Sequence, residues 1–158
     1  MLKRFRLEDM IPVICETINS GKRFKLYPRG TSMLPMIVED KTAVSLVKTD
    51  NPQKGDVLLY RRQNGQYVLH RCIKICGDEY VMCGDNQFVL EHGITRDMII
   101  AGIDGYYPGD KFVSVEDKEY KKYVKCLPMR RKYKKIKNLI LLVKNKIWRT
   151  QKSDFNEK

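Results

Sequence analysis

Between residues 24 and 115 the sequence is built from short apolar or alternating runs, each closed by Gly, Pro, Asn or Asp. Short runs separated by so many turn residues are typical of β-strands joined by tight connections. The pattern therefore predicts a mainly β domain over residues 24–117, with a curved or barrel-like antiparallel sheet. The expected strands are residues 24–27, 43–47, 57–61, 67–75, 80–83, 99–103 and 112–115.

Two turn signals order part of this sheet. Asn64-Gly65 lies between the third and fourth runs and favours a hairpin, because both positions of such a turn need positive φ. Gly77-Asp78 has the same effect between the fourth and fifth runs. These three runs are therefore expected to form an antiparallel meander, with His70 on its middle strand and Asp85 just beyond its last.

The N-terminal residues 1–23 predict a short amphipathic helix that packs on the β domain. Its apolar residues recur at helical spacing, and Asn19-Ser20-Gly21 provides a stop signal. The apolar run 10–15 is short and flanked by acidic residues, so neither a signal peptide nor a membrane anchor is expected here. The apolar positions are Leu7, Met10, Ile11, Ile14 and Ile18.

The basic excess of the chain is confined to its C-terminal part. Residues 1–117 hold 16 Lys and Arg against 16 Asp and Glu, whereas residues 118–158 hold 15 against 3. We expect a basic amphipathic helical tail over residues 118–150, with its helix at 129–149, and a disordered end at 151–158. The apolar positions of that helix are Ile136, Leu139, Ile140, Val143 and Ile147, and Trp148 adds an aromatic side chain.

Such a tail has three possible partners. Residues 129–149 suit the surface of an anionic membrane, and the protein would then be cytoplasmic and peripheral on the inner membrane face. Nucleic acid is disfavoured, because the helix carries apolar positions and few aromatic side chains. Docking of the apolar positions on protein is an equal alternative to membrane binding. The uncharged run 138–143 is too short to cross a bilayer.

The five cysteines show no metal-binding or redox spacing. They form no CxxC pair, and an odd number without such a pattern favours reduced, mostly buried thiols in a cytosolic chain. No metal and no cofactor is therefore expected. The residues are Cys15, Cys72, Cys76, Cys83 and Cys126.

The loop Gly30-Thr31-Ser32-Met33-Leu34-Pro35 holds a serine hydroxyl in constrained backbone. Gly30 can adopt backbone angles closed to other residues, and Leu34 precedes a proline, so Ser32 is expected on a fixed, non-helical turn. A serine becomes a nucleophile when a nearby base takes its proton and a third group orients that base. The chain has two histidines, His70 on an expected strand and His92, which we expect to be exposed. His70 is therefore the candidate base.

Four motifs in chain order resemble the superfamily of signal peptidase I and the LexA-like serine proteases. They are Gly30-x-Ser32-Met33-x-Pro35, Gly55-Asp56-Val57-Leu58, His70-Arg71 and Gly84-Asp85-Asn86. Bacterial signal peptidases place lysine at the base position, whereas the endoplasmic-reticulum and archaeal types place histidine, and His70-Arg71 resembles the second kind. The resemblance covers residues 24–114 and implies the curved β fold of that superfamily.

The resemblance also implies roles for individual residues. Ser32 would be the nucleophile and His70 the general base, while Asp85 and Glu91 are alternatives for the acid that orients the imidazole. Met33 would line the substrate groove, and the backbone N–H groups of Thr31 and Ser32 would bind the oxyanion. Arg71 is expected to form a structural salt bridge with the Gly84-Asp85-Asn86 loop.

Two functions follow as expectations. The first is a serine endopeptidase that removes a leader, signal or propeptide from a protein precursor, through a centre of Ser32, His70 and either Asp85 or Glu91. The second is a non-catalytic protein that keeps this scaffold and binds membrane, nucleic acid or a protein partner through its basic tail.

Overall fold

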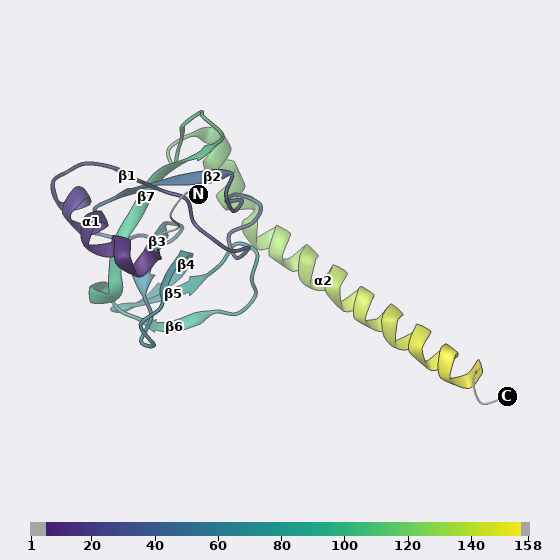
Figure 1. Cartoon of the computed structure of the whole chain (residues 1–158). Coiled ribbons are helices and arrows are strands. Elements are labelled where there is room, and N and C mark those ends of the chain that lie inside the picture. The colour runs from purple at the N-terminus through teal and green to yellow at the C-terminus, as the bar shows by residue number, and fades with distance from the viewer. Residues whose placement is uncertain (1–5, 156–158) are drawn as a thin grey trace. The chain divides into compact units, whose positions relative to one another are not determined.

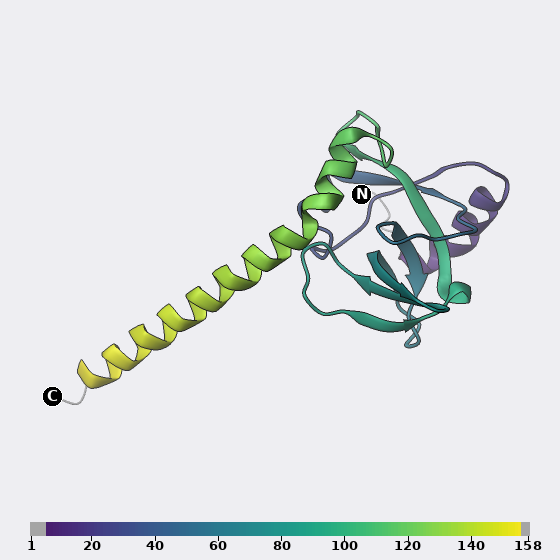
Figure 2. The same cartoon turned by 180° about the vertical axis from the view of Figure 1, so that it is seen from behind.

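The computed structural model describes residues 6–155, with side chains described to Leu142. The chain divides into two compact units, Met1–Val124 and Lys125–Lys158. The first unit contains one helix, the sheet and the first residues of a second helix (Figures 1 and 2).

The sheet is mainly antiparallel, as the sequence predicts, but it is open. Its strands follow the order β1-β2-β7-β3-β4-β5-β6, and β8 pairs with β7. Within the described residues no pairing joins β1 to β6, so the sheet does not close into a barrel. The strands are β1 (Phe24–Leu26), β2 (Thr42–Val47), β3 (Val57–Arg61), β4 (Tyr67–Cys76), β5 (Glu79–Cys83), β6 (Glu91–Ile94), β7 (Ile99–Pro108) and β8 (Val113–Ser114).

The expected meander is present. β3 pairs with β4 and β4 with β5, both antiparallel, and His70 lies on β4 opposite Leu58 of β3. The sequence did not predict β6, whose residues Glu-His-Gly-Ile show no strand periodicity. A short 3-10 helix, Arg96–Met98, follows β6.

β7 joins the two halves of the sheet. It is a ten-residue strand, longer than the expected 99–103. Its C-terminal part pairs with β2, and its N-terminal part pairs with β3. Because β7 pairs with both β2 and β3, the loop before β2, which contains Ser32, belongs to the same sheet as the β3–β4 hairpin.

Side chains on both faces of β3 are buried. Val57 and Leu59 belong to one apolar cluster, and Leu58 and Tyr60 belong to another, as the alternation of a strand requires. Helix α1 (Leu7–Asn19) contributes Ile14 and Ile18 to the first cluster and lies against β1 and β2 (Figure 1). The short N-terminal helix is thus confirmed.

Helix α2 (Lys118–Phe155) is longer than predicted at both ends. It begins 11 residues before the expected start at Met129, and Tyr120 in its first turn is buried in the core of the first unit. Residues 151–155, expected to be disordered, are helical, while 156–158 lie outside the described residues. The side chains of Val143, Ile147 and Trp148 also lie outside the described part. No described helix has an apolar stretch long enough to cross a membrane.

Candidate active site

The Ser32 loop is fixed by buried neighbours. Gly30 has a φ of +92°, which glycine adopts without a steric penalty, and successive turns follow from Ser32 to Met36. Met33 and Ile37 are buried in the core on either side of these turns, and the amide of Ile37 donates to the carbonyl of Met33. Ser32 itself is half-buried, so its hydroxyl is held at the surface of a packed loop.

A second loop packs directly against Ser32. The backbone N–H of Asn86 donates to the Ser32 carbonyl at 2.7 Å, and the Asn86 side-chain amide donates to the Thr31 carbonyl at 3.0 Å. A Cβ on Gly84 would lie 2.6 Å from the Ser32 carbonyl oxygen, which is too close for any side chain. The Gly84-Asp85-Asn86 motif therefore positions the backbone of the serine loop.

His70 is buried and is held through one ring nitrogen. Its Nδ1 lies 2.7 Å from the Glu91 carboxylate and 3.3 Å from the Tyr60 hydroxyl. A neutral imidazole that donates its Nδ1 proton to a carboxylate carries its lone pair on Nε2, the tautomer a general base needs. Within the described part of the chain, Nε2 has no hydrogen-bond partner.

Glu91 is held in turn by Arg62. The guanidinium donates to both carboxylate oxygens, at 2.6 and 2.7 Å, and also donates to Gln66 at 3.1 Å. Burial alone would raise the pKa of the Glu91 carboxyl, but hydrogen bonds from Arg62 and Tyr60 outweigh burial and hold it below its ordinary value. Glu91 is therefore ionised at neutral pH.

The same environment keeps the imidazole neutral. Burial lowers the pKa of His70, and the Arg62 cation lowers it further, which together outweigh the opposing effect of Glu91. Burial also raises the pKa of the Tyr60 hydroxyl, with the Glu91 charge acting in the same direction. At neutral pH the centre thus holds a carboxylate, a neutral imidazole and a neutral phenol.

Asp85 occupies a different position from Glu91. Arg71 donates to both oxygens of Asp85, at 2.8 and 2.7 Å, and the Tyr123 hydroxyl adds a third hydrogen bond at 3.1 Å. Arg71 is 2% exposed and also donates to the Gly55 carbonyl and the Tyr120 hydroxyl. Burial opposes the charge of Arg71, but its bonds to Asp85 raise its pKa above the ordinary value.

The structure places the two alternative acids, Glu91 and Asp85, in different surroundings. Glu91 makes the hydrogen bond to His70, and the Asp85 carboxylate is held by a buried guanidinium. The expected salt bridge between Arg71 and the Gly84-Asp85-Asn86 loop is present. Asp85 thus stabilises the loop that packs on Ser32.

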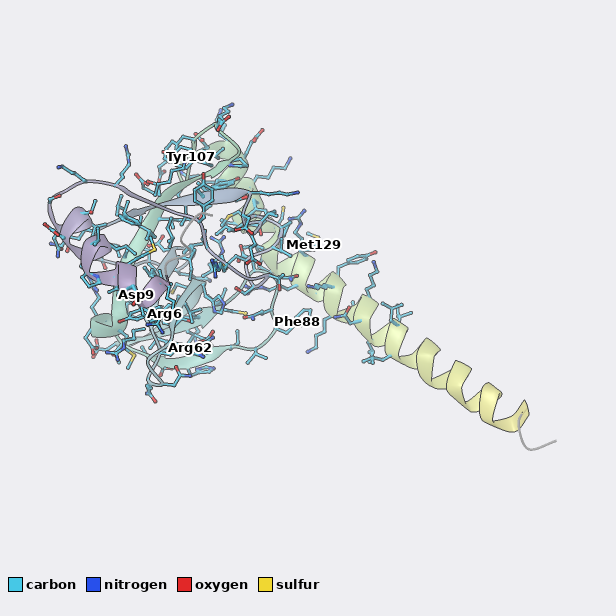
Figure 3. All side chains as sticks on the ribbon, viewed as in Figure 1. Arg6, Asp9, Arg62, Phe88, Tyr107 and Met129 are labelled. Atoms are coloured by element: carbon cyan, nitrogen blue, oxygen red, sulfur yellow. The ribbon has the colours of Figure 1, made fainter. Side chains whose placement is uncertain are left out.

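Ser32 and His70 line one pocket of about 530 Å³. Met33, Leu59 and Leu69 contribute apolar walls, as Met33 was expected to do for a substrate groove. Helix α1 contributes to the rim, and Arg6 and Arg62, both labelled in Figure 3, also border the pocket. The Ser32 hydroxyl and the imidazole form no hydrogen bond with each other within the described residues.

The expected oxyanion donors are open. Thr31 is exposed, and in the described part of the chain no acceptor takes the backbone N–H of Thr31 or Ser32. Free N–H groups beside a nucleophile can bind the negative oxygen of a tetrahedral intermediate.

The remaining sequence candidates lie elsewhere. His92 is exposed, as expected, and its Nδ1 is 3.3 Å from Glu79. All five cysteines are free thiols, of which Cys72 and Cys83 are buried and Cys76 is exposed. Among the described residues, no group of three His, Cys, Asp or Glu side chains could hold a metal ion.

Sequence reasoning missed Tyr60 and Arg62. Tyr60 reads as an ordinary apolar strand position, and Arg62 follows β3 as one of two consecutive arginines. The hairpin at Asn64-Gly65 was the available signal, because it places residue 62 beside the strand that carries His70. No family model, curated protein or solved structure matches the chain.

Proposed function

We propose that this protein is a serine endopeptidase that removes a leader, signal or propeptide from a protein precursor. The observation that carries the proposal is the pocket shared by the Ser32 hydroxyl and an imidazole that Glu91 holds by Nδ1. A nucleophile, a neutral base and an ionised orienting acid are the parts that acyl transfer requires.

In the proposed mechanism, Ser32 Oγ attacks the scissile carbonyl while His70 Nε2 takes the hydroxyl proton. Glu91 stabilises the resulting imidazolium, and the N–H groups of Thr31 and Ser32 bind the oxyanion. The imidazolium then gives its proton to the leaving amine as the C–N bond breaks, which leaves an acyl-enzyme. His70 then takes a proton from water as the water oxygen attacks the ester, and the imidazolium returns that proton to Ser32 Oγ as the acyl C–O bond breaks, which regenerates the serine and releases the acid.

Substrate binding has to complete this geometry. Ser32 Oγ and His70 line the same pocket without a hydrogen bond between them among the described residues, and a peptide that fills the pocket would bring them into contact. The apolar walls favour an apolar or small side chain next to the scissile bond. The five free thiols favour action in the reducing cytoplasm, or at the inner face of the membrane.

The test uses the full chain with a fluorophosphonate probe and a complex peptide mixture. We expect covalent labelling of Ser32, located by mass spectrometry, and new peptide termini that vanish with Ser32→Ala and His70→Ala. Ser20→Ala serves as the control, because this exposed serine lies in the turn after α1. Full activity of either site variant would remove the proposed mechanism, and the non-catalytic alternative would take its place.

A further inference from the structure

The C-terminal unit presents an apolar stripe on a basic helix. From Met129 the apolar residues follow alternating spacings of four and three, which keeps the first four within about 60° of the helix circumference. Their side chains are well exposed: Met129 74%, Tyr133 70%, Ile136 49% and Ile140 50%. At Leu139–Leu142 the helix is apolar all round, since Leu139, Leu141 and Leu142 lie off the stripe and are also exposed.

The charge around this stripe has one sign. Residues 129–149 hold nine Lys and Arg and no Asp or Glu. A second copy of the helix would bring lysines against lysines along the edges of the stripe, which opposes self-association. A nucleic acid would neutralise the cations but leave the apolar side chains in water.

We propose that residues 129–149 form a docking surface for an anionic lipid bilayer. The helix would lie in the membrane plane, with the stripe at the boundary between headgroups and acyl chains and the lysines among the lipid phosphates. Both features of the segment, its exposed apolar side chains and its unbroken positive charge, are matched by this one partner. The surface is independent of the proposed peptidase centre, because none of its residues lines the pocket.

The test is cosedimentation of the full chain with vesicles of phosphatidylcholine alone or mixed with phosphatidylglycerol. We expect binding to the anionic vesicles that is lost at high salt, because salt screens exposed charges. Lys135→Glu with Lys137→Glu should weaken binding by about 10-fold or more, since each basic residue near the surface contributes about 1 kcal/mol. Ile136→Ser with Ile140→Ser should also abolish most of the binding.

The matched control is Lys22→Glu with Lys74→Glu, which changes net charge equally on exposed residues of the first unit. Binding equal to that of the parent is expected for this variant. Three results would overturn the proposal: equal or absent binding to the two vesicle types, a lipid-independent dimer that the Ile136 and Ile140 variant dissociates, or tighter binding to RNA than to anionic vesicles at one salt concentration.

A second inference rests on a different observation, the two hydrogen bonds from Arg62 to Glu91. We infer that Arg62 is a positioning residue of the candidate centre, which fixes Glu91 against His70 and keeps the imidazole neutral with its proton on Nδ1. This inference rests on the proposed function for its role in turnover. The geometric evidence is independent of turnover. The Arg62 guanidinium nitrogens lie 2.6 and 2.7 Å from the Glu91 carboxylate oxygens, and a Glu91 oxygen lies 2.7 Å from His70 Nδ1.

The charged and titratable groups around the imidazole come from four parts of the fold. Glu91 lies on β6, Arg62 follows β3, Tyr60 lies on β3, and Asp85 follows β5. Burial is the largest influence on the pKa of His70 and lowers it, the Glu91 and Asp85 carboxylates raise it, and the Arg62 cation lowers it. Tyr60 stays protonated. Removing the Arg62 charge leaves Glu91 uncompensated and favours the imidazolium.

The experiment is an NMR titration of the two imidazole rings in the full chain. In Arg62→Gln we expect the midpoint of His70 to rise by about 1 pH unit or more, the usual effect of a nearby carboxylate. His92 should not move, since it is exposed and faces Glu79. Arg61→Gln is the matched control, because Arg61 lies over the Tyr67 ring and does not contact Glu91.

Arg62→Gln combined with Glu91→Gln removes both charges and should bring the midpoint back down, which tests the inference if the single variant folds poorly. An unchanged His70 midpoint in Arg62→Gln, or an equal rise in Arg61→Gln, would refute it. The titration needs no turnover. A shifted midpoint in a protein that cleaves nothing would therefore reject the proposed peptidase while leaving this inference intact.

Discussion

Asn86 and Ser32 are joined by a backbone hydrogen bond of 2.7 Å, although 54 positions separate them in the chain. The bond brings the loop after β5 against the loop before β2 and leaves no room for a side chain at Gly84. The position of the Ser32 loop therefore depends on a loop that is distant in the sequence.

Gly84→Ala should displace the serine loop. The added Cβ would meet the Ser32 carbonyl at 2.6 Å and the Ser32 Cβ at 3.0 Å, and backbone must move to relieve the contact. We expect a loss of about 1–3 kcal/mol in the free energy of unfolding, measured with urea, and reduced labelling of Ser32. Gly102→Ala is the control, because its nearest contact is an ordinary 3.4 Å. Equal stability of both variants would show that the close approach has no energetic weight.

Removing one partner of the buried Arg71–Asp85 ion pair should destabilise the protein more than its share of the loss when both are replaced. Asp85→Asn leaves a guanidinium that is 2% exposed without its counter-charge, and we expect a loss of about 3–5 kcal/mol in the free energy of unfolding. Arg71→Met with Asp85→Leu should cost less than the two single changes added, because no buried charge remains. Urea denaturation of Asp85→Asn, of the singles Arg71→Met and Asp85→Leu, and of their double variant measures this coupling. Additive losses would count against a direct pair.

Stability should fall on the acid side of neutrality because of His70. An unfolded histidine binds its proton near pH ~6.5. The folded pKa of His70 is lower, since burial disfavours the imidazolium. As the pH falls through that window the unfolded state takes up the proton first, and the free energy of unfolding drops by up to about 1.4 kcal/mol per pH unit. Below the folded pKa this group adds no further loss.

Urea unfolding across this pH range measures the effect. His70→Gln should remove the decrease, whereas His92→Gln should keep it, because His92 is exposed. A decrease that persists in His70→Gln would have to come from another group.

Local signals in the sequence were sufficient for most of the strands and for the hairpins of the meander. The meander of β3, β4 and β5 follows from turn residues at Asn64-Gly65 and Gly77-Asp78, and strand alternation was enough to place His70 within it. The buried pair of Arg71 with the Gly84-Asp85-Asn86 loop also follows from adjacent motifs.

The side chains that interact with His70 could not be predicted from local sequence signals, because their positions depend on pairing between strands. Glu91 reaches His70 because β6 pairs with β5, yet β6 has no strand pattern of its own. Tyr60 reaches the same imidazole from β3, and Arg62, just after β3, reaches Glu91. From sequence, Asp85 within its motif was favoured over Glu91, the residue that makes the bond, because spacing along the chain does not show which strands pair.

Proteolysis by the proposed centre should persist to a lower pH than an unperturbed imidazole allows. The base must be neutral, and burial together with Arg62 lowers the pKa of His70. The rate therefore falls only when the pH drops through the lowered pKa of His70, which lies below the ordinary imidazole value of ~6.5. It rises again when the pH is raised and the imidazole loses its proton. The measurement is the pH dependence of kcat/KM for a cleaved peptide, since this parameter reports ionisation in the free enzyme. The His70 midpoint from NMR should coincide with that limb, and a limb well above it would assign the essential base to a different group.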